Sequence, residues 1–519
     1  MPESAHHASG APSARRRCDV AIVGYGPAGA ALANLLGQAG LSVMVFEREA
    51  GVYPLPRAIH FDGEVMRIFH SMGLAEEVGA VSRPGLTGMH FVNAAGETLL
   101  VRGGTAQRGM HGVASNYYFH QPELEAVLRS AVERFPNVEV HLRHEVTAIT
   151  ENAAGALLQV NNLADGDTRA VEAGYVVGCD GARSLVRRLM GSSMTDLGLH
   201  QSWLVFDVML KRQVDLPEYT VQHCDPARPM TACYVTATRR RWEIMLLPGE
   251  DPTEISRPEK VWSLVSRWVT PEDADLERAA VYTFHSVIAE GWRRGRLLLA
   301  GDSAHQTPPF LGQGMCAGIR DVANLAWKLV MVTRGLADDA LLETYESERK
   351  PHVRAFIDLA VRLGDIIQTT DRVVAAERDR RFRDSEPEIF VYPTPLLGPG
   401  VHRGEAPAGG VFWQPALADG RLLDAAIGLN FAVIGERALL EAVHEGTRAL
   451  WRAVGATVLS DPGGELGEWM HVNKARALIL RPDRYLVGTA GDAAALESLS
   501  AALPVTPVAA GAPVNAKPA

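Results

Sequence analysis

A glycine-rich turn near the start of the chain constrains the fold more than any other feature of the sequence. The six residues from Gly24 to Gly29, GYGPAG, match the pattern G-x-G-x-x-G. They follow the apolar run from Val20 to Val23 and open an Ala/Leu-rich stretch that ends near Ala39. An apolar, β-branched run at 42–47 comes next, which is typical of a strand buried in a parallel sheet. The segment therefore predicts a βαβ unit.

Each position of this turn has a physical reason. Gly24 allows the tight turn, Gly26 lets the backbone approach a pyrophosphate, and Gly29 permits close packing of the helix. The helix N-terminus adds partial positive charge. Glu47 ends the second strand, where its carboxylate can accept hydrogen bonds from the ribose hydroxyls of an adenosine. A dinucleotide site follows, although the motif alone does not distinguish FAD from NAD, and a chance glycine turn is the alternative.

The rest of the chain predicts more than one domain. A length of 519 residues exceeds what one hydrophobic core usually supports. Segments between 201 and 284, such as 232–237 and 242–247, suggest antiparallel strands with one wet face. A buried strand at 296–300 and a long helix from Gly314 to Arg334, stopped by Gly335, return the chain to the parallel sheet. The parallel-sheet domain is thus expected to be discontinuous.

Charge and cysteine content exclude several classes of function. The 51 Lys and Arg residues against 61 Asp and Glu leave a net charge of -10, which gives no general attraction to nucleic acid or anionic lipid. The five cysteines form no C-x-x-C pair, so neither a disulfide framework nor a structural metal site is expected. No apolar run is long enough to cross a bilayer. We expect a cytoplasmic enzyme without a metal; a homo-oligomer is compatible with the sequence.

Two further motifs resemble a known family. The string from Gly301 to His305, followed by PPFLGQGM at 308–315, looks like the second flavin motif of the single-component aromatic hydroxylases, the p-hydroxybenzoate hydroxylase family. CDGARS at 179–184 resembles the D-G motif of that family. The resemblance implies FAD as cofactor, with the aspartate matching Asp302 on the ribityl chain and the helix from Gly314 under the flavin ring. A free helix start would stabilise negative charge on reduced flavin.

The strings at 53–62 and 316–329 look like those of the 3-(3-hydroxyphenyl)propionate hydroxylases within this family. The resemblance implies an α/β fold with a discontinuous Rossmann-like FAD-binding domain, an inserted, mainly antiparallel substrate domain and a thioredoxin-like C-terminal domain. No cysteine follows Cys316, so that last domain cannot perform dithiol chemistry. The predicted divisions are an FAD-binding domain at 18–90, 116–190 and 285–392, a substrate-binding sheet domain at 91–115 and 191–284, a linker at 393–410, a thioredoxin-like domain at 411–503, and disordered tails at 1–17 and 504–519.

The motifs and the resemblance give a set of predicted contacts. The cofactor-binding residues are predicted to be Gly24, Gly26, Pro27, Ala28, Gly29, Glu47, Arg48, Arg57, Gln121, Asp180, Gly181, Gly301, Asp302, Pro309, Gly312, Gln313, Gly314 and Met315. His60 and Asp62 are candidates for proton handling, and the alternative is that they satisfy each other or cap a helix. Tyr234 and His285 are candidates for substrate contact, with core packing as the alternative.

The implied reaction is hydroxylation of a phenol, ortho or para to its hydroxyl, by NADH or NADPH and O₂ through a C4a-hydroperoxyflavin. Relatives favour a carboxylate-bearing phenol, and a bulkier polyphenol or polyketide-derived phenol is the alternative within the family. A flavoprotein dehydrogenase that incorporates no oxygen is a further alternative. The Trp-x-Trp-x-Ile-Pro pattern of flavin halogenases is missing from the sequence, which argues against that class.

Overall fold

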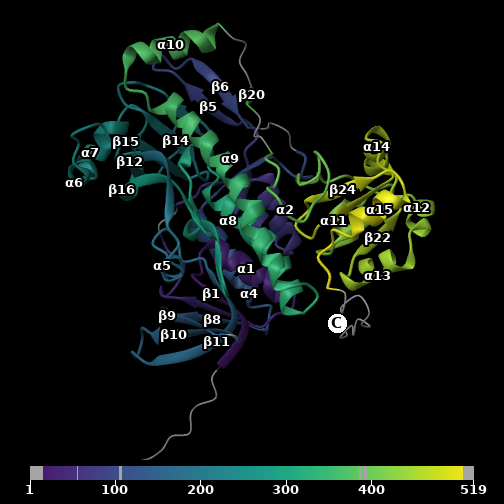
Figure 1. Ribbon diagram of the computed structural model, residues 1–519. Coiled ribbons are helices and arrows are strands. Elements are labelled where there is room, and N and C mark those ends of the chain that lie inside the picture. Colours follow the sequence, from purple (N-terminus) through teal and green to yellow (C-terminus); the bar gives the residue numbers. More distant parts are fainter. Residues whose placement is uncertain are drawn as a thin grey trace, which may run out of the picture.

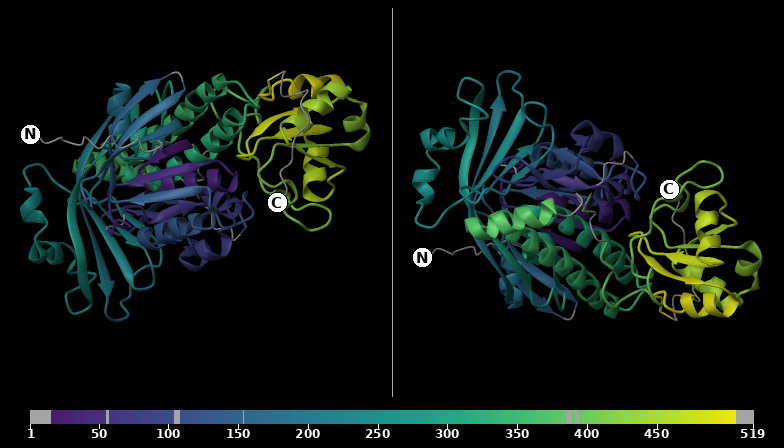
Figure 2. Two further views of the ribbon diagram at one scale, coloured as in Figure 1. Left: turned by 90° about the horizontal axis from the view of Figure 1, so that it is seen from below. Right: turned by 90° about the horizontal axis from the view of Figure 1, so that it is seen from above.

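The computed structural model describes residues 16–54, 57–103, 108–152, 154–384, 389–390 and 394–506. These residues form two large sheets with helices between and beside them, and a smaller C-terminal domain (Figure 1). Figure 2 shows this domain at the end of the molecule opposite α6 (Pro252–Ile255) and α7 (Pro258–Val265). Most of the two predicted tails lies outside the described residues, but the first strand already begins at Arg16.

The first sheet carries the predicted βαβ unit. Its strands are β1 (Arg16–Val23), β2 (Val43–Glu47), β8 (Val138–Leu142), β9 (His144–Asn152), β10 (Gly155–Asn162), β11 (Thr168–Gly178), β17 (Arg293–Arg294) and β18 (Leu297–Leu299). They are ordered β17-β18-β11-β1-β2-β8, with β10 and β9 added at β11. β1 is parallel to both β2 and β11, and α1 (Pro27–Gln38) follows it directly. The predicted strand, glycine turn and helix are therefore confirmed.

The second sheet is mainly antiparallel. Its strands in the described residues are β5 (Met89–Val92), β6 (Thr98–Arg102), β12 (Met194–Leu210), β13 (Val221–His223), β14 (Met230–Tyr234), β15 (Arg239–Met245), β16 (Ala274–Ala289), β19 (His305–Gln306) and β20 (Ile389–Phe390). Two of these, β14 and β15, begin earlier than the predicted segments at 232–237 and 242–247. The residues between the two strands form a hairpin turn. Phe206, Trp242 and Ile244 pack on one face of this sheet together with Val261 of α7. On the opposite face, Trp203, Val205 and Met245 belong to a second apolar cluster that includes residues 356–367 in part.

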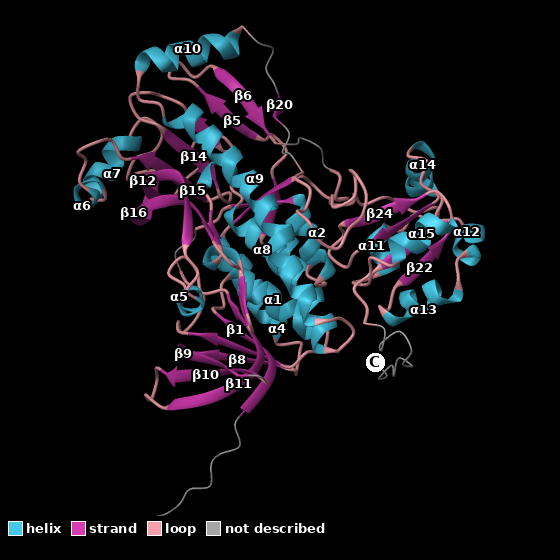
Figure 3. Ribbon diagram, viewed as in Figure 1, coloured by secondary structure: helices cyan, strands magenta, loops and turns pink. Residues whose placement is uncertain are grey.

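Two long helices join the sheets. α8 (Gly314–Thr333) packs against α1, and its bounds match the predicted helix, with Arg334 as C-cap and Gly335 at φ +68°. α9 (Glu343–Gln368) contacts α8 near one end and β16 of the second sheet. Figure 3 shows α8 and α9 running between the strands of the two sheets. The parallel-sheet domain and the inserted sheet thus share one helical layer.

Shorter elements complete this part of the chain. They are the three-stranded sheet of β3 (His60–Asp62), β7 (Asn116–Phe119) and β4 (Ser82–Pro84), the helices α2 (Gly63–Ser71), α3 (Ala75–Ala80), α4 (Gln121–Val132), α5 (Leu185–Met190) and α10 (Arg372–Arg383), and the 3-10 turns η1 (Gly301–Ser303), η2 (Pro309–Leu311) and η3 (Asp339–Leu342).

The C-terminal domain has a four-stranded sheet flanked by helices. Its elements are α11 (Leu423–Ile427), β21 (Ala432–Gly435), α12 (Arg437–Ala442), α13 (Glu445–Ala453), β22 (Thr457–Ser460), α14 (Gly464–Val472), β23 (Ala477–Leu480), β24 (Leu486–Ala490) and α15 (Ala493–Ser500). The strand order is β22-β21-β23-β24, with β21 parallel to β22 and antiparallel to β23. This mixed sheet is the thioredoxin-like arrangement that the sequence predicts.

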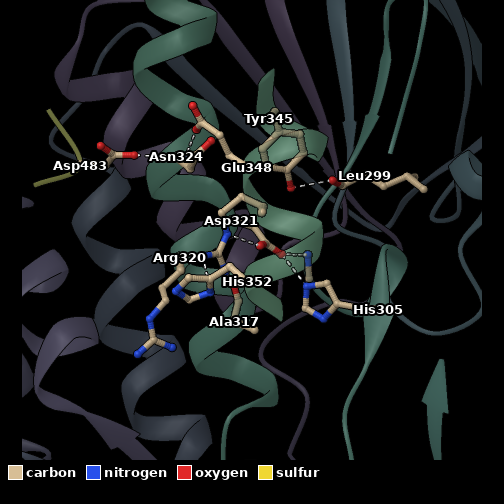
Figure 4. A network of polar contacts seen from close by, with 12 residues as sticks. Leu299, His305, Ala317, Arg320, Asp321, Asn324, Tyr345, Glu348, His352 and Asp483 are labelled. Atoms are coloured by element: carbon tan, nitrogen blue, oxygen red, sulfur yellow. Dashed lines mark hydrogen bonds and ion pairs between the residues drawn. The ribbon is translucent and has the colours of Figure 1, made fainter. Parts of the chain in front are cut away.

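A closed group of buried charges fastens the C-terminal domain to α8 and α9. The Lys328 ammonium donates to Glu348 Oε2 over 2.7 Å, and Arg481 donates to Glu348 Oε1 over 2.9 Å and to Asp483 Oδ2 over 2.6 Å. Asn324 bridges Glu348 and Asp483 from α8 (Figure 4). We call Lys328, Glu348, Arg481 and Asp483 the interface cluster. Their side chains are at most 1% exposed, so each charge is compensated inside the protein.

Candidate active site

A cavity of about 360 Å³ is lined by residues of both large-sheet regions, a volume within the range of small-molecule sites. Its wall combines the β1–α1 turn, η1 and the start of α8 with strands β12, β14, β15 and β16. The predicted site residues in its wall are Gly26, Pro27, Ala28, Arg57, His60, Gln121, Gly181, His285, Gly301, Asp302, Pro309, Gly312, Gly314 and Met315. The structure therefore brings together motifs that are almost 300 residues apart in the sequence.

The β1–α1 turn forms an open cradle. Gly24 has φ +97°, and a Cβ there would lie 2.4 Å from the Cys179 carbonyl oxygen. A Cβ on Gly29 would lie 2.1 Å from the Gly24 oxygen, so both positions require glycine. A Cβ on Gly26 would meet no heavy atom within 4 Å. No side chain caps the start of α1, which leaves its first N–H groups for an anion.

Glu47 lies at the end of β2 beside this turn. Its carboxylate accepts hydrogen bonds from the backbone N–H of Tyr25 over 2.8 Å and of Glu49 over 2.9 Å. Arg48 is an exposed neighbour whose side chain is 3.4 Å from Glu49. Neither Glu47 nor Arg48 belongs to the cavity wall, so their assignment to the cofactor stays a prediction.

The start of α8 forms a second cradle in the wall of the same cavity. Gly312 adopts the left-handed conformation at φ +61°, and Gln313 is the N-cap without a capping side chain. Gly314 and Met315 then present their N–H groups at the wall. Behind this cradle, Asp321 accepts from the N–H of Gly301 over 3.1 Å and holds the turn of η1 against α8. A positive helix end here suits an electron-rich group.

Buried contacts hold Asp321 in place. His305 Nε2 lies 2.6 Å from its Oδ2, and Arg349 Nε donates to its Oδ1 over 3.0 Å. Figure 4 shows His305 and Asp321 turned toward each other, next to the Tyr345 hydroxyl that donates to the Leu299 oxygen. The two cradles are thus built on a rigid base.

Arg57 and Gln121, predicted separately, meet at the mouth of the cavity. Gln121 Oε1 accepts from the N–H groups of Arg57 over 2.8 Å and Ala58 over 2.7 Å. The exposed Arg57 guanidinium is 3.9 Å from the Asp302 carboxylate. The amide of Gln121 therefore fixes the segment that carries Arg57, a cation suited to a pyrophosphate.

Asp180 supplies a direct test of whether a ligand fits the first cradle. Its Oδ2 accepts from the N–H groups of Leu185 over 2.7 Å and Val186 over 3.1 Å, but its Oδ1 is buried without a hydrogen-bond partner in the described residues. Gly181, at φ +76°, lines the cavity beside it. An unsatisfied buried acceptor beside the β1–α1 turn fits a ligand with hydroxyl and phosphate groups, as FAD has.

The two proton-handling candidates have different surroundings. His60 lines the cavity, its Nε2 is 2.9 Å from Asn116 Oδ1, and burial lowers the pKa of its ring. Asp62 caps α2 through the N–H of Val65 and is bound by Arg320 and Gln313. Burial alone would raise the pKa of Asp62, but Arg320 and its hydrogen bonds lower it to about 2. Asp62 therefore matches the capping alternative.

The two substrate candidates also differ. His285 lines the cavity, and its Nδ1 lies 2.6 Å from His200 Nδ1. Tyr234 is buried outside the wall, with its ring between the guanidinium groups of Arg83 and Arg240 and its hydroxyl accepting from Arg83. Tyr234 thus packs behind the site, because its side chain leaves β14 on the face opposite Cys233.

Sequence reasoning missed the polar face of the second sheet. Arg241 and Glu243 line the cavity, whereas Trp242 and Ile244 pack in the core below α7. The alternation on β15 indicates a wet face, but only the fold shows that this face is the cavity wall. The other residues of the wall on this side that were not predicted include Asn116, Tyr118, Gln222, Thr231, Arg278 and Tyr282.

A group of charges sits in this wall. Arg241 donates to Asp207 over 2.7 Å, Arg278 also binds Asp207, and the Glu243 carboxylate lies 3.9 Å from Arg241. We call Asp207, Arg241, Glu243 and Arg278 the cavity cluster. Both guanidinium groups donate to Asp207, whereas no described residue donates a hydrogen bond to the Glu243 carboxyl group.

The described residues hold neither a metal-binding cluster nor a membrane-spanning helix. They contain no group of three or more His, Cys, Asp or Glu side chains placed to hold a metal ion. Within the same residues no helix has the length and apolar character needed to span a bilayer.

Comparison with known proteins identifies the family. The model of the FAD binding domain matches residues 17–360, and that of the HcaD C-terminal domain matches 455–505. A probable NADH-specific resorcinol 4-hydroxylase of Rhodococcus jostii (strain RHA1) is 39% identical, covering 97% of each chain. A 3-(3-hydroxy-phenyl)propionate/3-hydroxycinnamic acid hydroxylase of Burkholderia cenocepacia (strain HI2424) is 36% identical, covering 94% of this chain and 96% of its own.

Solved structures share the fold. The flavin-dependent monooxygenase PieE, in complex with FAD and substrate, has a TM-score of 0.81 at 20% identity, covering 94% of this chain and 98% of its own. Aklavinone-11 hydroxylase, in a ternary complex with FAD and aklavinone, has a TM-score of 0.78 at 22% identity, covering 95% of this chain and 100% of its own. These likenesses support the architecture described above.

The sheet topology, the two cradles and the matched family model define a flavoprotein. The chain belongs to the FAD-binding-domain family of aromatic hydroxylases. It is an FAD-dependent monooxygenase that takes electrons from a reduced nicotinamide and acts on a phenolic compound. The predicted family, fold class, cofactor and enzyme class are thereby confirmed, and the alternative of a dehydrogenase without oxygen incorporation is set aside.

Proposed function

We propose that this enzyme hydroxylates a small phenol of the resorcinol type with NADH and O₂. The observation that carries the proposal is the cavity in which the two flavin cradles face the polar side of the second sheet. The relative at 39% identity is named for resorcinol and NADH, and the one at 36% for hydroxyphenylpropionate. The second substrate class, a phenol with a carboxylate side chain, is therefore the main competitor.

The chain's own residues have separable tasks in this proposal. The N–H groups after Gly26, together with Arg57, would hold the pyrophosphate of FAD, and Glu47 would hold the ribose. Asp180 would accept a hydrogen bond from the cofactor through Oδ1, and Asp302 would contact the ribityl chain. The start of α8 would stabilise negative charge at the edge of the ring. FAD, when bound, supplies hydride acceptance and oxygen activation.

The opposite wall orients the phenol. His60 and Asn116 hydrogen-bond each other at the junction between flavin cradles and sheet, within reach of the cavity. Burial lowers the pKa of His60, which favours the neutral form of its ring. A site that excludes water limits unproductive loss of reducing equivalents as peroxide.

A cytoplasmic site of action is part of the proposal. The five cysteines Cys18, Cys179, Cys224, Cys233 and Cys316 are all free thiols, which suits a reducing compartment where NADH is available. The oligomeric state stays a prediction.

The test is NADH oxidation by the FAD-loaded protein with a panel of phenols that includes resorcinol and 3-(3-hydroxyphenyl)propionate. Hydroxylated product and peroxide are measured together. We expect resorcinol-type compounds to give product nearly equal to the NADH consumed. Tight coupling only with the carboxylate-bearing phenol would reassign the substrate, and stimulation that gives only peroxide with every phenol would contradict the proposal.

A further inference from the structure

Glu243 stands out among the charged residues around the cavity. It lies in the middle of β15, paired with Val205 on β12 and Thr231 on β14, and its side chain is 12% exposed. Within the described wall the carboxylic acids are Glu243 on the sheet side and Asp302 on the cofactor side. Asp302 is 44% exposed and lies beside Arg57, so Glu243 is the acid that faces the substrate half of the cavity.

The neighbours of Glu243 leave its carboxyl group unsatisfied. Arg241 Nη1 is 3.9 Å from Glu243 Oε1. Its Nε and Nη2 donate to Asp207, and its Nη1 donates to the carbonyl oxygen of Arg57. No described residue donates a hydrogen bond to the Glu243 carboxyl group, which lines the cavity. Burial raises the pKa of Glu243 above its usual range. A buried carboxyl group without a donor is costly, and a ligand hydroxyl would relieve that cost.

The charges of the wall disfavour an anionic ligand near Glu243. Arg241 and Arg278 carry two positive charges, which Asp207 and an ionised Glu243 balance, so the cavity cluster as a whole presents no net positive charge to a substrate carboxylate. A substrate carboxylate placed against Glu243 would bring two acidic groups together, which raises the free energy of the complex. A phenol hydroxyl, in contrast, donates to a carboxylate or accepts from a protonated carboxyl group.

We propose that Glu243 binds the substrate hydroxyl group that points away from the two cradles. Glu243 thereby selects neutral dihydroxybenzenes over phenols with a carboxylate side chain. This inference rests on the proposed function and names the residue that decides between its two substrate classes. A site built around a hydrogen bond rejects analogues that lack the partner group more strongly than an apolar site does.

The test compares the FAD-loaded wild type with Glu243→Gln and Glu243→Leu. Dissociation constants for resorcinol and 3-(3-hydroxyphenyl)propionate are measured from changes in flavin absorbance, without NADH, so that binding is separated from chemistry. We expect the wild type to bind resorcinol at least about tenfold more tightly than the carboxylate. Glu243→Leu should weaken resorcinol by about tenfold, and Glu243→Gln should tighten the carboxylate by a similar factor.

Two controls make the outcome decisive. Glu277→Gln, on β16 and ion-paired with Arg239 instead of the cavity cluster, should change neither constant. FAD content and circular dichroism verify that each variant is folded; if the leucine variant fails to fold, the nearly isosteric Glu243→Gln still tests the selection against carboxylate. Unchanged selectivity in Glu243→Gln overturns the inference. Wild-type hydroxylation of resorcinol in that case leaves the proposed function intact, whereas no phenol hydroxylation at all removes the proposed function itself.

Discussion

The interface cluster and the cavity cluster contain similar buried charges but leave them in different states. In the interface cluster, Glu348 accepts from both Lys328 and Arg481, and both of its oxygens are used. In the cavity cluster, Asp207 takes the hydrogen bonds of two arginines and Glu243 is left without a donor. The first group closes on itself at the junction of two domains, and the second opens onto a cavity.

The difference separates stability from function. A buried charge that loses its partner costs several kcal/mol, so a closed group resists change at any member. An open group destabilises the free protein by part of that amount, and a ligand that supplies the missing partner removes this destabilisation. Changes in the interface cluster should therefore affect unfolding, and changes in the cavity wall should affect binding.

The largest expected effect is on Glu348. Glu348→Ala leaves Lys328 and Arg481 buried without their shared carboxylate, which should lower the free energy of unfolding by about 3–5 kcal/mol. Urea unfolding measures it. The control is Glu343→Ala on the same helix, where the carboxylate is 69% exposed and the expected loss is below about 1 kcal/mol. A loss below about 1 kcal/mol for Glu348→Ala as well would remove the distinction between closed and open groups.

The flavin cradle should show the opposite behaviour. Gly26→Val adds a side chain where a Cβ meets no heavy atom within 4 Å, at an ordinary φ of -71°, so the unfolding free energy should change by at most about 1 kcal/mol. The same side chain fills the space for the pyrophosphate, and FAD affinity should fall about 100-fold or more. Titration of apoprotein with FAD measures this, with Gly79→Val in α3 as control. Retained FAD affinity in Gly26→Val would mean that the cofactor lies elsewhere.

Asp62 lies near the cavity, but its carboxylate is fully hydrogen-bonded, so it tests whether such bonding rather than position decides the effect on stability. Its pKa is about 2 in the folded protein against 3.8 as the ordinary value, so its stabilisation is complete above pH about 4 and is lost as pH falls through about 2. The loss should be about 2 kcal/mol. Asp62→Asn should flatten the unfolding free energy over this pH range. A variant with the wild-type slope would show that the ion pair with Arg320 contributes nothing.

The smallest expected effect concerns His352, which lies against Arg349 and Tyr485 between α9 and the C-terminal domain. Burial, with Arg349 and Arg320 nearby, lowers the pKa of His352 well below 6.5. Below pH 6.5 this histidine is therefore protonated in the unfolded chain but not in the folded protein. The free energy of unfolding falls as a result, by about 1 kcal/mol at pH 6. His352→Asn should remove this slope in thermal unfolding; an identical pH dependence would contradict the assignment.

Local patterns in the sequence predicted the parts of the site that depend on the backbone. The turn from Gly24 to Gly29 and the start of α8 at Gly314 require glycines and helix ends, and these requirements are visible over a few residues. Arg57 and Gln121 are also both in the predicted set, although no sequence pattern indicates that they are in contact.

The parts that depend on distant partners could not be predicted. Asp62 reads as a catalytic candidate until Arg320, far along the chain on α8, is placed beside it. Glu243 reads as a solvent-facing residue, because alternation on a strand does not say whether the polar face meets solvent or a cavity. The sequence suggests that Tyr234 contacts the substrate, but in the structure its ring packs behind the cavity wall against Arg240.

The most direct test of the central claim is the fate of oxygen with resorcinol as substrate. The FAD-loaded enzyme is supplied with NADH and oxygen-18 gas, and the products are identified by mass spectrometry. We predict a trihydroxybenzene that carries one oxygen-18 atom, formed in near equality with the NADH consumed. Resorcinol recovered unchanged while peroxide accumulates would contradict the account, because the cavity would then be built for a different phenol.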